Sequence, residues 1–557
     1  MGESKNEDIA VKKEELIKKW FQRPENFTFI VILIFAIAIR IYYFSLTKSQ
    51  PLWWDETDYL AYAKHIAGFP VSWTVSGQHN SLFPFIVAVF FKLGFSEVIT
   101  KFFVELIPSI LVVFLTYFIV SLIYKDKKIA LISTFLVAVL WELLFNSMRF
   151  HLEGPALVFG LLSIYVFWQG YENKKKVFGL DSKWAIILTV LLVVITYGMR
   201  RGFFVFGFFF LAYMLLTRDL KSLIKDKYNW IALGLGIAVL LLFEMVVFRA
   251  PITGVISKYS GSSGVLFSLL PFDVFKNYFL NMNNSILSIL LYLFWIGLIL
   301  MLLKVFLYIG NLKKTENKDV KGDLFLILTI ILTLAYFVLY QKPSGDFGEG
   351  RWYFPLLLGS IVCISRASIV IYDYTKKYGK YLGILVLVIL LGFGGYYQIM
   401  QADLTIKNKV DSFSGVKEAG LYLHDIVAEN EAIIGYPTPQ IAYYSERNVV
   451  DPEWIIGKPS VESSPEEFLN AIQKNEDIKY LVIYLFEPGW PSWMLHLNYV
   501  TTASGTVISG WEIPFMDTSV DFVNQKQNIL EEKTYGNLKF KLLAIKQDVL
   551  IYEIERI

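Results

Sequence analysis

Long apolar runs separated by short polar loops fill the first 400 residues of the chain. A helix needs about 20 mostly apolar residues to cross a bilayer. About eleven runs approach or exceed this length and predict a polytopic all-α membrane region. The predicted spans are 27–46, 98–123, 129–148, 154–171, 184–199, 202–216, 229–249, 285–309, 324–340, 353–371 and 381–400. The run at 82–95 has only about 14 residues and includes Lys92, which favours a helix that does not span.

Basic residues in the loops predict the orientation, because cytoplasmic loops are enriched in Lys and Arg. If 82–95 does not cross, every basic cluster lies on one side, with the N-terminus inside and the C-terminus outside. The clusters are Lys12/Lys13/Lys18/Lys19, Lys125/Lys127/Lys128, Lys174/Lys175/Lys176/Lys183, Arg218/Lys221/Lys225/Lys227, Lys313/Lys314/Lys318/Lys321 and Lys376/Lys377/Lys380. The first outer loop, 47–97, then carries juxtamembrane helices.

The pattern changes after residue 400, where helix-like and strand-like stretches alternate between Pro and Gly. We therefore predict three parts: an amphipathic cytoplasmic segment at 1–26, a membrane domain at 27–400, and an extracytoplasmic α/β domain at 401–557. We expect the last part to select or position an acceptor. The predicted elements of this domain are helices at Phe413–Glu429 and Pro465–Asn475, and strands at Ala432–Gly435, Tyr480–Phe486, Lys539–Ile545 and Val549–Ile554.

Composition narrows the class of protein. Hydrophobic residues make up 55% and charged residues 18% of the chain, which is typical of a membrane protein. The net charge of +3 and the lack of a basic stripe argue against a nucleic-acid partner. The one cysteine, Cys363, excludes a disulfide framework. Metalloprotease, nucleophile-elbow and phosphate-loop motifs are absent from the sequence.

An acidic motif follows the first predicted span. Asp55 and Glu56 could supply a carboxylate base and its partner, with Tyr59 nearby. The plain structural alternative is that Asp55 caps a helix running to Ala67, while Trp53 and Trp54 anchor the chain at the membrane interface.

Arginines gather at the predicted outer ends of the helices, where buried charge is costly unless it serves a purpose. The structural alternatives for these residues are headgroup contact, snorkelling and helix capping. The functional interpretation is an anion site, because arginine binds phosphate through two hydrogen bonds. Glu142 and Glu244 lie mid-span, where one of them could belong to an ion path, but we expect pairing within the bundle. The outer candidates are Arg149, His151 and Glu153, the pair Arg200 and Arg201, Arg351 with Tyr353, and Arg40, His79 and Lys101.

Carboxylates, arginines and aromatics on one side suit displacement of a phosphate leaving group by an acceptor hydroxyl. The carboxylate takes the hydroxyl proton, and the cations stabilise charge on the departing phosphate. A nucleotide sugar would be cytoplasmic, so a lipid-borne donor fits this side better. A divalent metal ion remains open as a cofactor.

These motifs resemble the GT-C superfamily of integral-membrane glycosyltransferases, in particular its protein O-mannosyltransferase and aminoarabinose transferase branch. The resemblance covers about the first 400 residues. It rests on the order and spacing of Leu52-Trp-Trp-Asp-Glu-Thr-Asp-Tyr59, His79-Asn-Ser-Leu-Phe-Pro84, Phe91-Lys-Leu-Gly94, Arg149-Phe-His-Leu-Glu153, Arg201-Gly-Phe203 and Arg351-Trp-Tyr-Phe-Pro355.

The resemblance implies inverting transfer from a polyprenyl-phosphate sugar to a hydroxyl of a glycan, lipid or protein. It implies Asp55 as base and Glu56 as its partner, with Arg149, Arg201 and Arg351 near the donor phosphate and Tyr353 at the lipid-phosphate cavity. The sequence departs from the family's pattern at three places. It has His79-Asn-Ser where the family has His-Pro-Pro or Lys-Pro-Pro, and Glu153 where the family usually has Asp. It also has Lys101 and Glu105, at one of which relatives often have Arg. The tail lacks Trp-Trp-Asp-Tyr-Gly, which argues against glycan transfer to asparagine.

We expect a multi-pass protein of a prokaryotic plasma membrane with its site facing outside. The main alternative is a transporter or flippase of a lipid-linked or anionic substrate. It would require repeated halves with broken helices, which the sequence does not show. A non-catalytic membrane scaffold is a third possibility.

Overall fold

A computed structural model describes residues 21–71, 81–248, 287–340, 350–486, 489–502 and 505–557. The predicted amphipathic segment, up to residue 20, and His79 lie outside these ranges. Contacts divide the chain into two compact units. We call them the helical unit (Met1–Lys48, Asn80–Phe83 and Phe95–Lys409) and the C-terminal unit (Ser49–His79, Pro84–Gly94 and Val410–Ile557).

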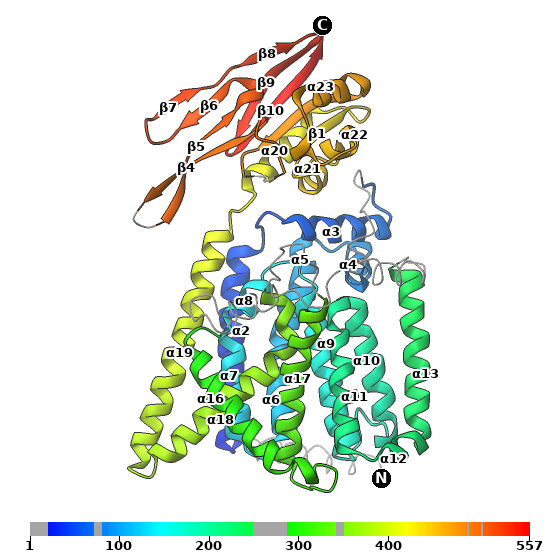
Figure 1. Cartoon of the computed structure of the whole chain (residues 1–557), viewed down its shortest axis with the longest axis vertical. Helices are drawn as coiled ribbons and strands as arrows, with labels where there is room; N and C mark the ends of the chain where they lie inside the picture. Colours follow the sequence, from blue (N-terminus) through cyan, green and yellow to red (C-terminus); the bar gives the residue numbers. More distant parts are fainter. Residues whose placement is uncertain (1–20, 72–80, 249–286, 341–349, 487–488, 503–504) are drawn as a thin grey trace, which may run out of the picture. The chain divides into compact units, whose positions relative to one another are not determined.

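The helical unit consists of apolar helices that run back and forth beside one another (Figure 1). Within the described residues, each predicted span is mostly helical, and seven helices there are long and apolar enough to cross a membrane. The run at 82–95 forms α4 (Leu82–Lys92), which at 11 residues is too short to span, as predicted. The helices are α2 (Pro24–Thr47), α5 (Glu97–Lys101), η1 (Phe102–Leu106), α6 (Ile107–Ile123), α7 (Lys127–Val139), α8 (Trp141–Asn146), α9 (Glu153–Val166), η2 (Phe167–Glu172), η3 (Ser182–Trp184), α10 (Ala185–Met199), η4 (Arg201–Phe204), α11 (Val205–Thr217), α12 (Leu220–Lys225), α13 (Lys227–Leu242), η5 (Phe243–Val247), η7 (Ser288–Leu290), α16 (Leu291–Leu307), η8 (Ile309–Asn311), α17 (Lys318–Tyr340), η9 (Gly350–Leu356), α18 (Leu357–Thr375) and α19 (Lys380–Lys409).

Close approach of small residues lets these helices pack in the absence of a hydrophobic driving force. Helix α16 crosses α18 at Gly297, where a Cβ atom would lie 1.8 Å from the carbonyl oxygen of Cys363. Any larger residue at position 297 would therefore separate the two helices.

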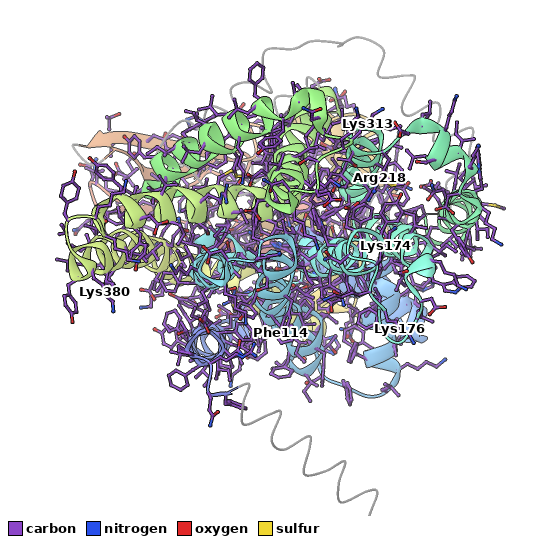
Figure 2. All side chains as sticks on the ribbon, turned by 90° about the horizontal axis from the view of Figure 1, so that it is seen from below. Phe114, Lys174, Lys176, Arg218, Lys313 and Lys380 are labelled. Carbon is purple, nitrogen blue, oxygen red and sulfur yellow. The ribbon has the colours of Figure 1, made fainter. Side chains whose placement is uncertain are left out.

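The basic loops lie together at one end of the helical unit. Figure 2 looks at this end and labels Lys174, Lys176, Arg218, Lys313 and Lys380. Ion pairs and hydrogen bonds join the loops there, from Arg218 to Glu172 at 2.7 Å, from Lys318 to Asn173 at 2.6 Å, and from Lys127 to Asn26 at 3.2 Å. The predicted grouping of these loops is thus present in the fold, and we call this the basic-loop end.

One predicted span is broken. Helix α7 ends at Val139 and α8 begins at Trp141, which leaves backbone groups unpaired inside an apolar bundle. Arg40 of α2 donates to the carbonyl of Ala138 at 2.9 Å and to the Ser109 hydroxyl at 2.7 Å. Gln398 of α19 accepts from the Trp141 N–H at 3.0 Å. Both side chains are fully buried. Arg40 therefore does not snorkel to the membrane surface but forms hydrogen bonds with backbone groups left unpaired by the break in the helix.

The C-terminal unit is an α/β fold with two sheets. Its six-stranded sheet has the order β2-β1-β3-β10-β9-β8, with β1 parallel to β2 and β3 and the other pairs antiparallel. A four-stranded antiparallel sheet follows the order β4-β5-β6-β7. Its elements are α3 (Trp54–Ala67), α20 (Ser414–Ile426), β1 (Ala432–Tyr436), α21 (Thr438–Ser445), β2 (Asn448–Val450), α22 (Pro452–Ile456), η10 (Ser460–Glu462), α23 (Pro465–Lys474), β3 (Ile478–Tyr484), β4 (His496–Thr502), β5 (Gly505–Ile513), η11 (Pro514–Met516), β6 (Thr518–Asp521), β7 (Lys526–Asn528), β8 (Glu532–Tyr535), β9 (Leu538–Lys546) and β10 (Val549–Arg556).

Buried side chains cover both faces of the six-stranded sheet. On one face, Val416 and Leu423 of α20 pack with Ile433 and Val482 of the sheet. On the other, Phe468 of α23 and strands of the second sheet form a larger cluster with Leu481. All the helices and strands predicted for the tail are present within a few residues of their predicted bounds.

Candidate functional site

A buried carboxylate between two arginines lies at the end of the helical unit opposite the basic loops. Glu153 is the first residue of α9 and is 1% exposed. Arg200, which follows α10, places its Nε 3.1 Å from Glu153 Oε1, and Arg351 of η9 places Nη1 3.8 Å from Oε2. Three segments far apart in the sequence therefore converge on one carboxylate. We call this end the arginine end.

His151 lies in the same place, in the loop between α8 and α9. Its Nδ1 is 2.9 Å from Asn146 Oδ1 of α8, and its side chain is buried. Burial lowers the pKa of His151 well below its usual range, and the nearby charges of Arg351, Arg149, Arg200 and Lys101 lower it further. Burial, together with the surrounding cations, therefore keeps His151 neutral.

The remaining predicted cations line the same end. Arg149, 1% exposed, donates from Nη2 to the carbonyl of Lys409 at 3.1 Å. Lys101, 3% exposed, donates to the carbonyl of Thr47 at 3.0 Å and lies over the Phe150 ring at 5.9 Å. Glu105 in the π-helical turn η1 accepts from the His151 N–H at 3.0 Å. Among the described residues named at this end, cationic side chains outnumber carboxylates, which favours an anionic ligand.

Arg201 takes a different direction from its neighbour. Its Nη2 lies 3.6 Å from Glu244 Oε2, and its guanidinium stacks on Phe248 at 3.9 Å. Tyr197 donates to the same carboxylate. Glu244 thus pairs within the bundle, as expected. The structure brings Arg200 to Glu153 and leaves the predicted phosphate ligand Arg201 in a separate ion pair.

Segment η9 supplies aromatic residues to the site. Tyr353 is 3% exposed, and Trp352 lies under Arg200 with 5.7 Å between the guanidinium and the ring. Residue 350 is glycine, and a Cβ atom there would lie 2.7 Å from Glu142 Oε1. Glu142 also accepts from Asn146 at 3.1 Å. Asn146 was not predicted as a site residue, although its i, i+4 spacing from Glu142 indicated a contact between those two side chains.

The acidic motif belongs to α3 in the C-terminal unit. Trp53, and not Asp55, occupies the N-cap position. Glu56 accepts from the Trp53 N–H at 3.0 Å, so the capping carboxylate is Glu56. The capping alternative for Asp55 is therefore wrong, and its half-buried carboxylate lies in the first turn. Tyr59 is 2% exposed on the same helix.

A metal site receives no support from the described side chains. Within those ranges, no three His, Cys, Asp or Glu side chains are grouped to hold an ion.

The sequence profile of the dolichyl-phosphate-mannose-protein mannosyltransferase family (PMT) matches residues 59–260. The match covers Lys101, Arg149, Glu153 and Arg200, and begins just after Asp55. A comparison with curated protein sequences found no significant match.

Three solved structures share the fold. The Archaeoglobus fulgidus oligosaccharyltransferase AglB, in complex with an inhibitory peptide and a dolichol-phosphate, has a TM-score of 0.59 at 12% identity, over 88% of this chain and 74% of that one. ArnT from Cupriavidus metallidurans bound to undecaprenyl phosphate has a TM-score of 0.53 at 10% identity, over 86% and 97%. The mycobacterial arabinofuranosyltransferase AftD has a TM-score of 0.50 at 9% identity, over 94% and 40%.

A crystal structure of the Archaeoglobus fulgidus enzyme was also determined in complex with zinc and sulfate. At these identities the likeness concerns the fold alone. The profile match at 59–260 and the shared fold agree with the resemblance found in the motifs: the chain has a fold similar to that of these membrane glycosyltransferases and a segment similar to the PMT family.

Proposed function

We propose that the protein transfers a sugar from a polyprenyl-phosphate donor to a hydroxyl acceptor at the arginine end, with inversion at the anomeric carbon. The observation that carries this proposal is the convergence of Arg200 and Arg351 on Glu153 beside a neutral His151. A buried excess of positive charge at the end of an apolar bundle suits a phosphate attached to a lipid.

In this mechanism Asp55 accepts the proton of the acceptor hydroxyl. The freed oxygen attacks the anomeric carbon, and the bond from that carbon to the phosphate oxygen breaks with its electron pair leaving on the phosphate. Arg200 and Arg351 stabilise the added negative charge, and polyprenyl phosphate is the second product. Glu56, which caps α3, holds the first turn that carries Asp55.

Two of the similar structures support a lipid phosphate as the ligand, since one is bound to dolichol-phosphate and the other to undecaprenyl phosphate. An acceptor hydroxyl on a lipid-linked glycan, lipid, polysaccharide or protein fits the proposed step equally well. We propose a prokaryotic plasma membrane as the location, with the N-terminus and the basic-loop end in the cytoplasm and the arginine end outside.

The experiment incubates purified protein with polyprenyl-phosphate sugars and hydroxyl acceptors and analyses the products by mass spectrometry. We expect a glycosylated acceptor together with polyprenyl phosphate in equal amounts. Asp55→Asn should abolish transfer while the protein remains folded, and Asp425→Asn, at an exposed position of α20, serves as the control. Normal turnover by Asp55→Asn would refute the role of Asp55. Flux of the lipid without glycosyl transfer in proteoliposomes would favour a transporter.

A further inference from the structure

The segment that carries Asp55 is part of the C-terminal unit, although nearly the whole helical unit separates it from the rest of that unit in sequence. Residues Ser49–His79 group with Val410–Ile557, and α3 packs on α21. The contacts that join them are specific, and they lie on both sides of Asp55.

The first contacts precede the acidic residues. The Leu52 N–H donates to the Tyr444 hydroxyl of α21 at 2.8 Å. Lys417 of α20 donates to the carbonyl of Ser49 at 3.2 Å, and its ammonium lies 5.8 Å from the Tyr444 ring. Two helices of the C-terminal unit therefore bind the backbone just before α3.

Trp54 makes the next contact. It is half-buried and packs against the cluster that includes Tyr436, Trp490 and Phe515. This position adjoins Asp55, so the aromatic residue beside the carboxylate extends the core of the C-terminal unit. The structure thus gives Trp54 a packing role within the C-terminal unit, and its position at a membrane interface stays a prediction.

The last contact is at the end of α3, where the Lys64 ammonium lies 4.1 Å from the centre of the Tyr443 ring. A cation so close to an aromatic face is attracted by the quadrupole of the ring. Backbone hydrogen bonds before Asp55, packing beside it and a cation–π contact after it together restrict how α3 can turn or shift.

We infer that the C-terminal unit positions the acidic segment for catalysis and that Tyr444 and Lys417 are positioning residues for Asp55. This inference rests on the proposed function of Asp55 and extends it. A base must lie within hydrogen-bond reach of the proton it removes, and a small displacement lowers the rate strongly. The C-terminal unit therefore sets the turnover with every acceptor, and this role is separate from any choice among acceptors.

The test compares Tyr444→Phe and Lys417→Met with the wild type. Tyr444→Phe removes only a hydroxyl, and Tyr499→Phe removes an equivalent hydroxyl from a β4 side chain that is 60% exposed. We expect Tyr444→Phe to lower kcat roughly five- to tenfold with two unrelated acceptors, as for loss of one hydrogen bond. Acceptor KM and the affinity for polyprenyl phosphate should change less than twofold, and Tyr499→Phe should behave as wild type.

Hydrogen–deuterium exchange supplies a readout that does not depend on activity. Deuterium uptake in a peptide spanning residues 49–60 should quicken in both variants. Tyr444→Phe removes the acceptor of the Leu52 N–H, and Lys417→Met removes the donor to the Ser49 carbonyl. If Tyr444→Phe folds poorly, Lys417→Met carries the same test. Unchanged uptake with unchanged kcat overturns the inference, as does a rise in acceptor KM alone.

Failure of the proposed function gives a different result. In that case Asp55→Asn keeps full activity, whereas faster exchange in Tyr444→Phe still reports that α3 is held by the C-terminal unit. Faster exchange without any loss of kcat, in an enzyme that does depend on Asp55, would overturn the positioning role alone.

Discussion

Arg200 lies 3.1 Å from Glu153, while Arg201, the next residue, lies 3.6 Å from Glu244. Adjacent arginines thus serve different carboxylates. Arg200 follows the last residue of α10 in an extended conformation, with φ −142° and ψ 108°, and Arg201 opens the turn η4. The backbone change between them sends the two side chains in different directions and makes them a matched pair for mutagenesis.

Arg200→Met should lower transfer more than Arg201→Met. Loss of Arg200 removes a charge-assisted contact at the proposed phosphate site, worth roughly 10- to 100-fold in kcat/KM. Loss of Arg201 leaves Glu244 with Tyr197 but without its cation, which should lower the apparent Tm. Steady-state kinetics and thermal unfolding of both variants in detergent check this. A larger loss of kcat/KM in Arg201→Met would contradict the site as described.

Glu153→Gln should reduce turnover by about tenfold or more, because Arg200 and Arg351 lose the charge that orients them. Glu153→Asp keeps a carboxylate and should retain more activity than Glu153→Gln. Product formation under saturating donor measures both variants. Equal activity in the two would show that the charge at position 153 is unimportant.

His151 should make stability depend on pH in the acidic range. Its pKa is lowered in the folded protein, whereas an unfolded histidine has a pKa of about 6.5. Below about pH 6.5 the unfolded chain takes up a proton that the folded one does not, so this contribution to stability falls as the pH decreases towards the folded pKa. Above pH 6.5 the contribution of His151 to stability is constant.

His151→Gln should remove this dependence, and the exposed His65→Gln serves as the control. The apparent Tm of the wild type should fall more between pH 7 and pH 5 than that of His151→Gln. An identical fall in the two proteins would show that His151 is not the group responsible.

Gln398→Leu should destabilise the helical unit. The Trp141 N–H would lose its acceptor at the break between α7 and α8, at a cost of about 1–3 kcal/mol for an unsatisfied buried group. Thermal unfolding in detergent measures the loss. Tyr396→Phe, at a position on the same helix that is 62% exposed, should leave the apparent Tm unchanged.

Hydropathy and loop charge predicted most of the helical unit, because apolar length and basic loops are local properties of the sequence. The break at Leu140 was not predicted, since nothing local ends a helix there. The partners that make it tolerable, Arg40 and Gln398, come from distant helices.

In the tail, strands with buried apolar residues, such as β3 and β10, were predicted, whereas β4 and β5 were missed. Their sheet is half exposed, and Tyr499 and Val507 point their apolar side chains outward at 60% and 46% exposure. A pattern of apolar residues therefore did not indicate a core there.

In the site, sequence placed the arginines at one end of the bundle but could not choose between Arg200 and Arg201. That choice depends on backbone dihedral angles at the end of α10. The packing of α3 on α21 could not be predicted from the sequence either. The residues in contact are far apart in the chain: Leu52 and Tyr444, for example, are separated by 392 positions.

This separation has a consequence for biosynthesis. The ribosome makes about 5–20 residues per second, so Leu52 emerges roughly 20–80 s before Tyr444. During that interval the acidic segment has no binding partner from α20 or α21, and a nascent or truncated chain cannot hold Asp55 in its final position. With Asp55 as the proposed base, the newly made protein would become active only once its last domain is complete.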